Sequence, residues 1–285
     1  MKFKLPRFIS HLPGILIVAL MALTMLFPLV VCVSVSLQTM DEIYSFEPVI
    51  IPAKLNFDNY SRAMHSGSWG LYFKNSFIVT LITLVISLII NSMSGYVFAR
   101  IRFKGSTALF MLILVGMMIP TQATLIPVFA LLRKMNFLGN GNSGLINTYP
   151  GLILPYIAGS FGVFLCRQFY ISFPKELDDA AMMDGCGRFR TFTKIYVPLS
   201  GPLFASLGVI KFTGTWNEYT WPLVATSGER LKTVQLALSS FRDEGEIFWN
   251  RLMAATLIVS LPIYIVFMFA QKYFVRGLLA GSIKS

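Results

Sequence analysis

The chain has few charged residues. Only 13% of its 285 residues are Asp, Glu, Lys or Arg, whereas a soluble domain carries about 25%. Hydrophobic residues make up 55% of the chain, and the mean hydropathy is +0.67. This composition excludes an ordinary soluble domain and indicates a protein built from membrane-spanning segments.

The residue types and motifs of catalytic and metal sites are also scarce. The two histidines lie far apart, and the three cysteines, Cys32, Cys166 and Cys186, have no metal-ligand spacing. We expect these cysteines to be small apolar side chains. The sequence lacks a phosphate-binding Gly-Lys-Ser/Thr loop, a zinc motif and a nucleophile elbow. We therefore predict no enzyme, no cofactor and no metal in this chain. Nucleic-acid binding is not expected either, because no basic and aromatic patch lies in a soluble domain.

Long apolar stretches are what the sequence does contain. Each is near or above the ~20 residues that an α-helix needs to cross ~30 Å of hydrocarbon. Helices satisfy their own backbone in lipid, and the alternating ten-residue segments of a β-barrel are missing. We predict an all-α membrane protein with six transmembrane helices at residues 12–36, 73–99, 108–132, 149–169, 200–221 and 252–271. The first stretch is too long for a signal peptide and lacks a cleavage site, so we expect it to be retained.

Basic residues predict the orientation of these helices. With the N-terminus inside, the inner segments hold fourteen Lys and Arg residues and the outer segments hold nine. Excess Lys and Arg marks the cytoplasmic side. We therefore predict cytoplasmic N- and C-termini, with residues 1–11 as a cytoplasmic N-terminus and residues 12–285 as a single transmembrane domain in membrane lipid.

The loop at residues 171–198, between the fourth and fifth stretches, is long for a compact bundle, and long loops tend to be functional. Pro174 suits the first turn of a helix. Three acidic residues follow it: Glu176, Asp178 and Asp179. Their negative charges would stabilise a helix by lying near the positive, N-terminal end of its dipole. Gly185 and Gly187 can end the helix. We predict a short cytoplasmic helix here.

One face of this predicted helix has small and short side chains. Leu177, Ala180, Ala181 and Asp184 recur at helical spacing. Ala180, Ala181 and Gly185 would let the backbone of another protein approach closely. From the residues alone, the helix is either a docking element for a soluble partner or a solvated surface helix.

The same loop resembles the EAA loop of ABC importer permeases. Asp179-Ala-Ala is followed by Gly185, Ile195 and Pro198 at the spacing of that motif. Asp179 stands where the family usually has Glu, which keeps the charge and shortens the side chain by one methylene. Other segments resemble the carbohydrate-uptake branch and cover nearly the whole chain, including Asn75-Ser76, residues 96–105, Met118-Ile-Pro120, Trp216-Asn-Glu-Tyr219 and residues 271–278.

The resemblance implies a type I ABC importer permease in a bacterial inner membrane. Its expected partners are a second, homologous permease, two ATPase subunits that bind ATP and Mg²⁺, and an extracytoplasmic sugar-binding protein. The predicted helix would be the coupling helix that docks on an ATPase subunit, through Glu176, Asp179, Ala180, Ala181, Asp184 and Gly185. The implied mechanism is alternating access, in which the pore faces first outward and then inward to import a sugar or oligosaccharide. The partner ATPase subunits hydrolyse the ATP.

The fifth stretch carries the most polar side chains of any span. Lys211 lies near its midpoint, where an ionisable residue costs at least ~2.5–3.5 kcal/mol on insertion scales. In one interpretation this face lines the translocation path with Lys211, Thr215, Asn217 and Glu218. In the other, Lys211 bonds backbone carbonyls or an acid of the partner permease. Trp216, Tyr219 and Trp221 would either stack on sugar rings or form the interfacial aromatic belt.

The outer loop between the fifth and sixth stretches contains a polar segment, Phe241–Glu246. By position it resembles the loop that reaches into the binding protein's sugar cleft in maltose-type relatives. Its candidate residues are Arg242, Asp243, Glu244 and Gly245. The alternative is an ordinary turn.

Three other functions are weighed against sugar import. A permease for glycerol phosphate or another small polar solute would share this architecture. An ion-coupled secondary transporter would need intramembrane acids, and the spans hold none apart from Glu218. A membrane scaffold that transports nothing would not need the polar face of the fifth stretch.

Overall fold

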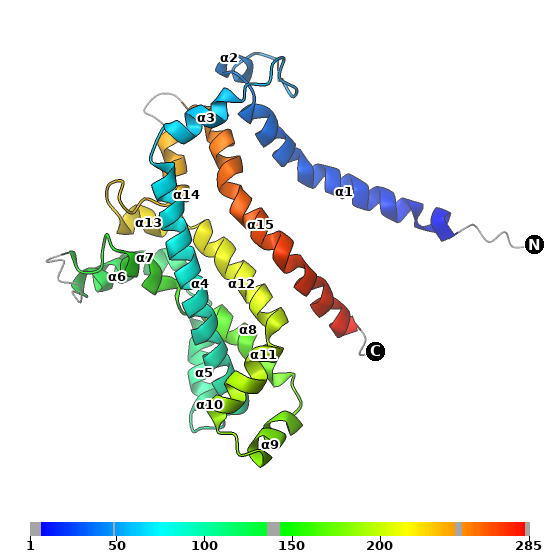
Figure 1. Cartoon of the computed structure of the whole chain (residues 1–285), viewed down its shortest axis with the longest axis vertical. Helices are drawn as coiled ribbons and strands as arrows, with labels where there is room; N and C mark the ends of the chain where they lie inside the picture. Colours follow the sequence, from blue (N-terminus) through cyan, green and yellow to red (C-terminus); the bar gives the residue numbers. More distant parts are fainter. Residues whose placement is uncertain (1–6, 48, 136–142, 243–246, 283–285) are drawn as a thin grey trace, which may run out of the picture. The chain divides into compact units, whose positions relative to one another are not determined.

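The protein is described here from a computed structural model, which covers residues 7–47, 49–135, 143–242 and 247–282. This part of the chain is helical and contains no β-strand, as predicted (Figure 1). It divides into two compact units. The first comprises residues 1–68 and 238–260, and the second comprises residues 69–237 and 261–285. The long last helix, α15 (Trp249–Ser282), has residues in both.

The first unit is organised around buried amide side chains. It contains α1 (Arg7–Ser36), α2 (Met40–Ile43), α3 (Asp58–His65), η4 (Ser239–Phe241) and the start of α15. The side-chain amide of Asn59, 1% exposed, donates to the carbonyls of Ser36 and Gln38 at 2.9 and 2.8 Å. Asn250 donates to the side-chain oxygen of Asn59 at 3.2 Å. These bonds tie the end of α1 to α3 and to the first turn of α15.

The second unit is built on α4 (Trp69–Arg100), against which α8 (Ser160–Ile171) and α12 (Gly201–Trp216) pack. Small residues allow α4 and α8 to approach closely. A Cβ on Gly95 would lie 2.4 Å from the Cβ of Cys166, and one on Gly162 would lie 2.6 Å from the Asn91 amide. Cys166 is fully buried in this contact, so it has the packing role expected of it.

The remaining elements of this unit lie between these three helices in the sequence or follow them. They are α5 (Ser106–Val115), α6 (Thr121–Lys134), α7 (Tyr149–Ile153), η2 (Leu154–Tyr156), α9 (Glu176–Met183), α10 (Arg188–Thr191), the π-helical turn η3 (Phe192–Tyr196), α11 (Val197–Leu199), α13 (Thr220–Ala225) and α14 (Val234–Leu238). α9 and α10 lie toward the Arg100 end of α4, and α13 lies toward its other end (Figure 1).

The predicted spans are only partly continuous helices. Three helical segments of the described chain are long and apolar enough to cross a membrane: Gly14–Ser36, Trp69–Arg100 and Trp249–Lys272. Two further pairs qualify if each bent pair is one span, namely Tyr149–Tyr156 with Ser160–Ile171, bent by 46°, and Arg188–Leu199 with Gly201–Trp216, bent by 78°. By length and composition, the structure therefore offers three to five spans.

The third predicted helix, residues 108–132, is not one helix. α5 ends at Val115, and α6 begins at Thr121 after an extended Pro120. Pro120 has no amide hydrogen to continue the helical ladder, so the chain breaks before it. Pro127, by contrast, lies inside α6 without ending it. The third stretch is therefore divided completely before Thr121, and α6 continues through Pro127.

Candidate functional site

The loop at residues 171–198 forms the short helix predicted for it, α9. Glu176, Asp178 and Asp179 all lie in its first turn, near the positive end of the helix dipole. At the other end, Gly185 adopts φ +71°, and the amides of Gly185 and Cys186 donate to the carbonyls of Met182 and Ala181 at 3.0 and 2.8 Å. This is a Schellman termination, which requires a left-handed residue and so favours glycine.

The exposed face of α9 differs from the predicted one. Ala181 is only 2% exposed and packs inward, so it does not belong to the outer surface. Ala180, Asp179 and Asp184 are exposed. Between them lie two large apolar side chains, Met182 and Met183, which are 51% and 89% exposed. Sequence reasoning missed these methionines because it looked for small residues, although two adjacent methionines in a polar loop were the available signal.

An aromatic cluster supports the inner side of this loop. Tyr96 of α4, Tyr170 of α8 and Phe192 and Tyr196 of η3 are buried together with Leu203 and Leu207 of α12. The rings of Tyr96 and Tyr196 lie 4.9 Å apart between centroids, and those of Tyr170 and Tyr196 lie 5.5 Å apart. The loop is therefore anchored to three long helices while the outer face of α9 stays open to solvent or to a partner.

Lys211 of α12 contacts the fourth predicted span where that span is broken, between η2 and α8. Its Nζ donates to the carbonyl oxygen of Tyr156, the last residue of η2, at 3.2 Å. A cation is favoured at this negative end of a short helix. The amide of Gly159, just beyond the break, donates to the side-chain oxygen of Asn91 at 3.3 Å. Lys211 and Asn91 thus form hydrogen bonds with backbone groups that have no helical partner at the break. This agrees with the interpretation in which Lys211 bonds backbone carbonyls.

Glu218 does not share a helix with Lys211. α12 ends at Trp216, and Glu218 instead caps α13 by accepting the amide of Trp221 at 3.0 Å. Its side chain also hydrogen-bonds Tyr156. Thr215 and Glu218 line a cavity of about 10 Å³, room for one water molecule. Two hydroxyls that line this cavity, those of Thr80 and Thr233, have no hydrogen-bond partner among the described residues.

The other polar and aromatic residues at this end of α12 divide between surface and core. Asn217 is exposed and accepts from the side-chain amide of Gln235 at 2.8 Å. Trp216 and Trp221 are 1% and 3% exposed, and the indole of Trp221 donates to the carbonyl of Gly151 at 3.0 Å. Neither tryptophan belongs to an aromatic belt or to an open sugar-stacking surface. Only Tyr219, at 39%, is exposed enough for such a role.

The segment leading toward the outer loop is fastened to the start of α4. The side-chain amide of Asn75 donates to the carbonyls of Arg230 and Lys232 at 3.0 and 2.9 Å. The amide of Val234 donates to the hydroxyl of Ser76 at 2.9 Å. These contacts give the Asn75-Ser76 pair a structural role that its sequence did not reveal.

The candidate binding-protein loop is described only at its edges. Arg242 is exposed and pairs with Ile247 in an isolated antiparallel bridge, which brings the two ends of the loop together. Asp243, Glu244 and Gly245 lie outside the described residues.

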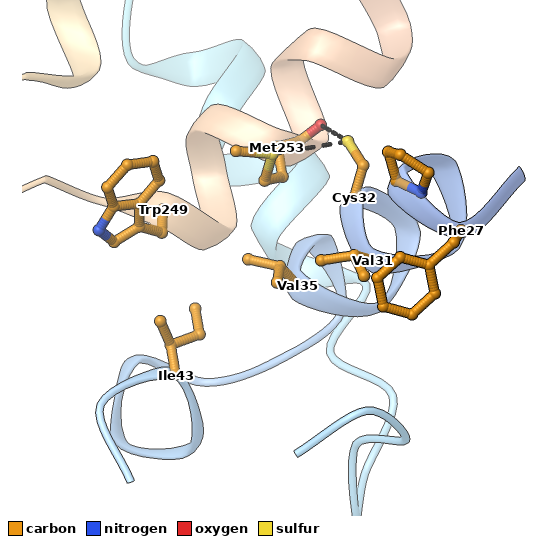
Figure 2. Close-up of a pocket in the computed structure, with 8 residues that line it drawn as sticks. Phe27, Val31, Cys32, Val35, Ile43, Trp249 and Met253 are labelled. Atoms are coloured by element: carbon orange, nitrogen blue, oxygen red, sulfur yellow. Dashed lines mark hydrogen bonds between the residues drawn. The ribbon is translucent and has the colours of Figure 1, made fainter. Parts of the chain in front are cut away.

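The first unit contains an apolar cavity. It has a volume of about 430 Å³ and lies between α1, α2 and the start of α15 (Figure 2). Phe27, Val31, Val35, Trp249 and Met253 are among the residues that line it. The Cys32 thiol lies 3.5 Å from the Met253 sulfur. Because sugar hydroxyls need hydrogen-bond partners, this cavity does not suit a sugar.

Comparison with known proteins agrees with this architecture. The probable ABC transporter permease protein YurM of Bacillus subtilis is 35% identical over 260 residues, which cover 90% of this chain and 83% of YurM. The arabinooligosaccharides transport system permease protein AraQ of the same organism is 35% identical over 238 residues, covering 82% of this chain and 81% of AraQ. These alignments span most of both proteins in each pair.

A solved structure shows the same fold. One chain of a bacterial ABC transporter involved in the import of the acidic polysaccharide alginate matches with a TM-score of 0.80. The match covers 96% of this chain and all of that one at 23% identity. A family model, described as binding-protein-dependent transport system inner membrane component, matches residues 91–279. The chain therefore belongs to this family of inner-membrane ABC transporter permeases, which are transport subunits and not enzymes.

Proposed function

We propose that this subunit, paired with a second permease, forms the pore of an importer for a sugar or oligosaccharide delivered by an extracytoplasmic binding protein. The observation that carries the proposal is the similarity to AraQ. The lactose transport system permease protein LacG of Rhizobium radiobacter, 35% identical over 228 residues, supports it. Family membership leaves no place for the ion-coupled transporter or the scaffold.

Glycerol phosphate is the second candidate substrate. The sn-glycerol-3-phosphate transport system permease protein UgpE of Yersinia pestis is 31% identical over 264 residues, 91% of its length. A phosphate group is usually held by several cations or by a bidentate Arg. In the described part of α12, the only cation is Lys211, and its ammonium already binds the Tyr156 carbonyl. This arrangement favours an uncharged sugar.

The substrate test uses the importer assembled with its binding protein in proteoliposomes. Maltose, lactose, an arabino-oligosaccharide and glycerol 3-phosphate are each offered with the binding protein, and ATP hydrolysis and uptake are measured. We expect at least one of the sugars to stimulate both and glycerol 3-phosphate to stimulate neither. Stimulation by glycerol 3-phosphate alone would contradict the sugar assignment.

The second part of the proposal concerns α9, as the coupling helix that docks on an ATPase subunit. Its exposed Met182 and Met183 offer apolar surface, and the exposed Glu176, Asp179 and Asp184 add negative charge to α9 and its C-terminal end. Ala180 and the glycine turn at Gly185 let the partner's backbone approach, while Ala181 supports the helix from behind. ATP and Mg²⁺ are bound by the ATPase subunits. Movement of the coupling helices would then switch the pore between outward- and inward-facing states.

For the translocation path we propose the part of the fifth span near Lys211, Thr215, Asn217 and Glu218. Asn217 is the exposed member and can meet a substrate directly. Lys211 and Glu218 would shape the path by holding the broken fourth span in place, since both contact Tyr156, and Thr215 lines the small cavity beside Tyr156. A conformational change at this break would therefore alter the surroundings of Lys211, Thr215 and Glu218.

The membrane topology is a further part of the proposal. We propose six spans, cytoplasmic termini and a single transmembrane domain at residues 12–285, on the basis of the apolar stretches and the excess of basic residues in the inner segments. The split third stretch would cross the membrane as α5 and α6 together.

Cysteine labelling tests this topology. In a background without Cys32, Cys166 and Cys186, single cysteines at Lys54 and at Arg188, both exposed, should react with a membrane-impermeant maleimide from opposite sides. Lys54 is expected to label in intact cells, and Arg188 only after permeabilisation. Labelling of both from the same side would contradict the six-span model.

The outer loop is expected to act in sugar release. If residues 241–246 enter the cleft of the binding protein, their replacement by a Gly-Ser linker should reduce uptake several-fold and leave docking of the binding protein nearly intact. Binding-protein affinity and uptake are measured side by side. The control replaces the exposed Ser227, in the same connection, by Gly and leaves Gly228, which has φ +70°, unchanged. Unchanged uptake would return the loop to an ordinary turn.

A further inference from the structure

The last residue of α4, Arg100, has a buried cationic side chain that contacts the loop at residues 171–198. The side chain of Arg100 is only 6% exposed. One terminal nitrogen of its guanidinium, Nη2, donates to the carbonyl oxygens of Phe173 and Pro174, each at 2.9 Å. These two residues lie directly before α9. The guanidinium of Arg100 is therefore bound to the segment that enters the helix.

The same guanidinium also binds α9 itself and the segment that follows it. Its Nε lies 3.3 Å from a carboxylate oxygen of Asp178 and donates to the hydroxyl of Tyr196. The Tyr196 hydroxyl in turn donates to the other carboxylate oxygen of Asp178 at 3.1 Å. Asp178 is 13% exposed, so this is a largely desolvated pair. Breaking such a pair by removing one partner is strongly unfavourable, because the other charge stays buried.

Three consecutive parts of one loop thus meet on one side chain of α4. The residues before α9, the first turn of α9 and the π-helical turn after it all contact Arg100 or its direct partners. α4 makes a second, weaker contact with this loop through the hydroxyl of Tyr96, which donates to the carbonyl of Arg188 at 3.3 Å. The turn between α9 and α10 carries two glycines, Gly185 and Gly187, and could bend if α9 were pushed.

We propose that Arg100 is a positioning residue for coupling: it fixes α9 to the end of α4, so that a displacement of α9 moves α4 instead of being absorbed by the loop. This inference rests on the proposed coupling function of α9. The geometry requires arginine in particular, because a planar guanidinium presents five donors in a fixed fork and can serve two carbonyls, a carboxylate and a hydroxyl at once. A lysine ammonium at the same place keeps the charge and loses this fork.

The test uses the complete importer, purified with its partner permease and ATPase subunits, and its binding protein loaded with maltose or an arabino-oligosaccharide. The variants are Arg100→Lys, Asp178→Asn and Tyr196→Phe. The matched control is Arg102→Lys, two residues along the same segment and exposed. Three quantities are measured for each: yield of assembled complex, ATP hydrolysis without binding protein, and its stimulation by the loaded binding protein.

We expect Arg100→Lys and Asp178→Asn to lower the stimulation at least tenfold in the assembled fraction, while hydrolysis without binding protein persists. Tyr196→Phe should show a smaller loss, and Arg102→Lys none. A role in stability alone predicts a different result: low yield, with normal stimulation in whatever complex assembles. That outcome, or full stimulation at full yield, would overturn the proposal.

The experiment also separates this inference from the coupling function on which it depends. Gly185→Trp, on the outer side of α9, is measured in parallel. If Gly185→Trp abolishes stimulation and Arg100→Lys does not, α9 couples to the ATPase without Arg100. If both variants are fully stimulated, the coupling function of α9 itself is wrong.

Discussion

Replacing Gly185 by Trp is expected to abolish stimulation of ATP hydrolysis by the binding protein. Gly185 ends α9 at φ +71°, a conformation that costs an L-residue roughly 1–2 kcal/mol. A Cβ there would meet nothing within 4 Å among the described residues, so the new side chain would start in open space. Trp would therefore distort the helix end and cover the surface proposed to face the ATPase. We expect more than a tenfold loss, measured on the assembled complex.

Two controls separate the distortion from the bulk of the new side chain. Gly185→Asn keeps a residue that tolerates the left-handed conformation and adds little volume, so it should retain most of the stimulation. Gly70→Trp places the same bulk on an exposed glycine near the opposite end of α4, where a new Cβ would also meet nothing within 4 Å. It should behave as the unmodified protein. Normal stimulation of the Gly185→Trp complex would contradict docking through α9.

The short helix α9 in the loop at residues 171–198 was predictable because local rules determine it. Acidic residues in its first turn and a glycine that can adopt positive φ act within one or two turns of the chain. Which face of α9 points outward depends on the aromatic cluster contributed by α4, α8 and η3. That packing is not visible in the loop sequence, and so Ala181 was placed on the wrong side.

The apolar stretches predicted a helical membrane protein, and they were less informative about where helices break. Hydropathy measures the length of an apolar segment and ignores whether its backbone continues as one helix. Pro120 divides the third stretch. In the fifth stretch, α12 ends at Trp216, before Glu218. The prediction that Lys211 and Glu218 share one helical face is wrong for that reason. Their common neighbour, Tyr156, comes from the broken fourth span, which sequence spacing could not indicate.

The arginine at the end of α4 was recognised in the sequence only as part of the basic inner segments and of a family motif. A cytoplasmic Arg beside the membrane is common, and its role depends on what it touches. Arg100 contacts residues 73 to 96 positions away in the sequence, and each of these contacts is tertiary. Asp178, similarly, appeared to serve only the helix dipole, while in the structure it is also the partner of Arg100.

Lys211→Met is expected to lower the yield and thermal stability of the assembled importer. The substitution removes the donor to the Tyr156 carbonyl, which lies at the break between η2 and α8. Leaving this part-buried acceptor without a partner costs at most about 1–3 kcal/mol. Met keeps similar length and apolar volume, so packing along α12 should change little. Transport per assembled complex is expected to stay within about twofold, a difference of less than about 0.5 kcal/mol.

Two further variants make this expectation specific to the hydrogen bond. Lys211→Arg retains a cationic donor and should recover much of the yield, whereas Lys134→Met, on an exposed lysine at the end of α6, should change neither yield nor stability. The measurements are thermal unfolding of the purified complex and uptake per complex. Full yield and stability of Lys211→Met, together with an altered transport rate or substrate range, would show instead that the ammonium acts on the substrate. Because Nζ then would have to leave Tyr156 during transport, that result would also identify the break in the fourth span as a part that moves.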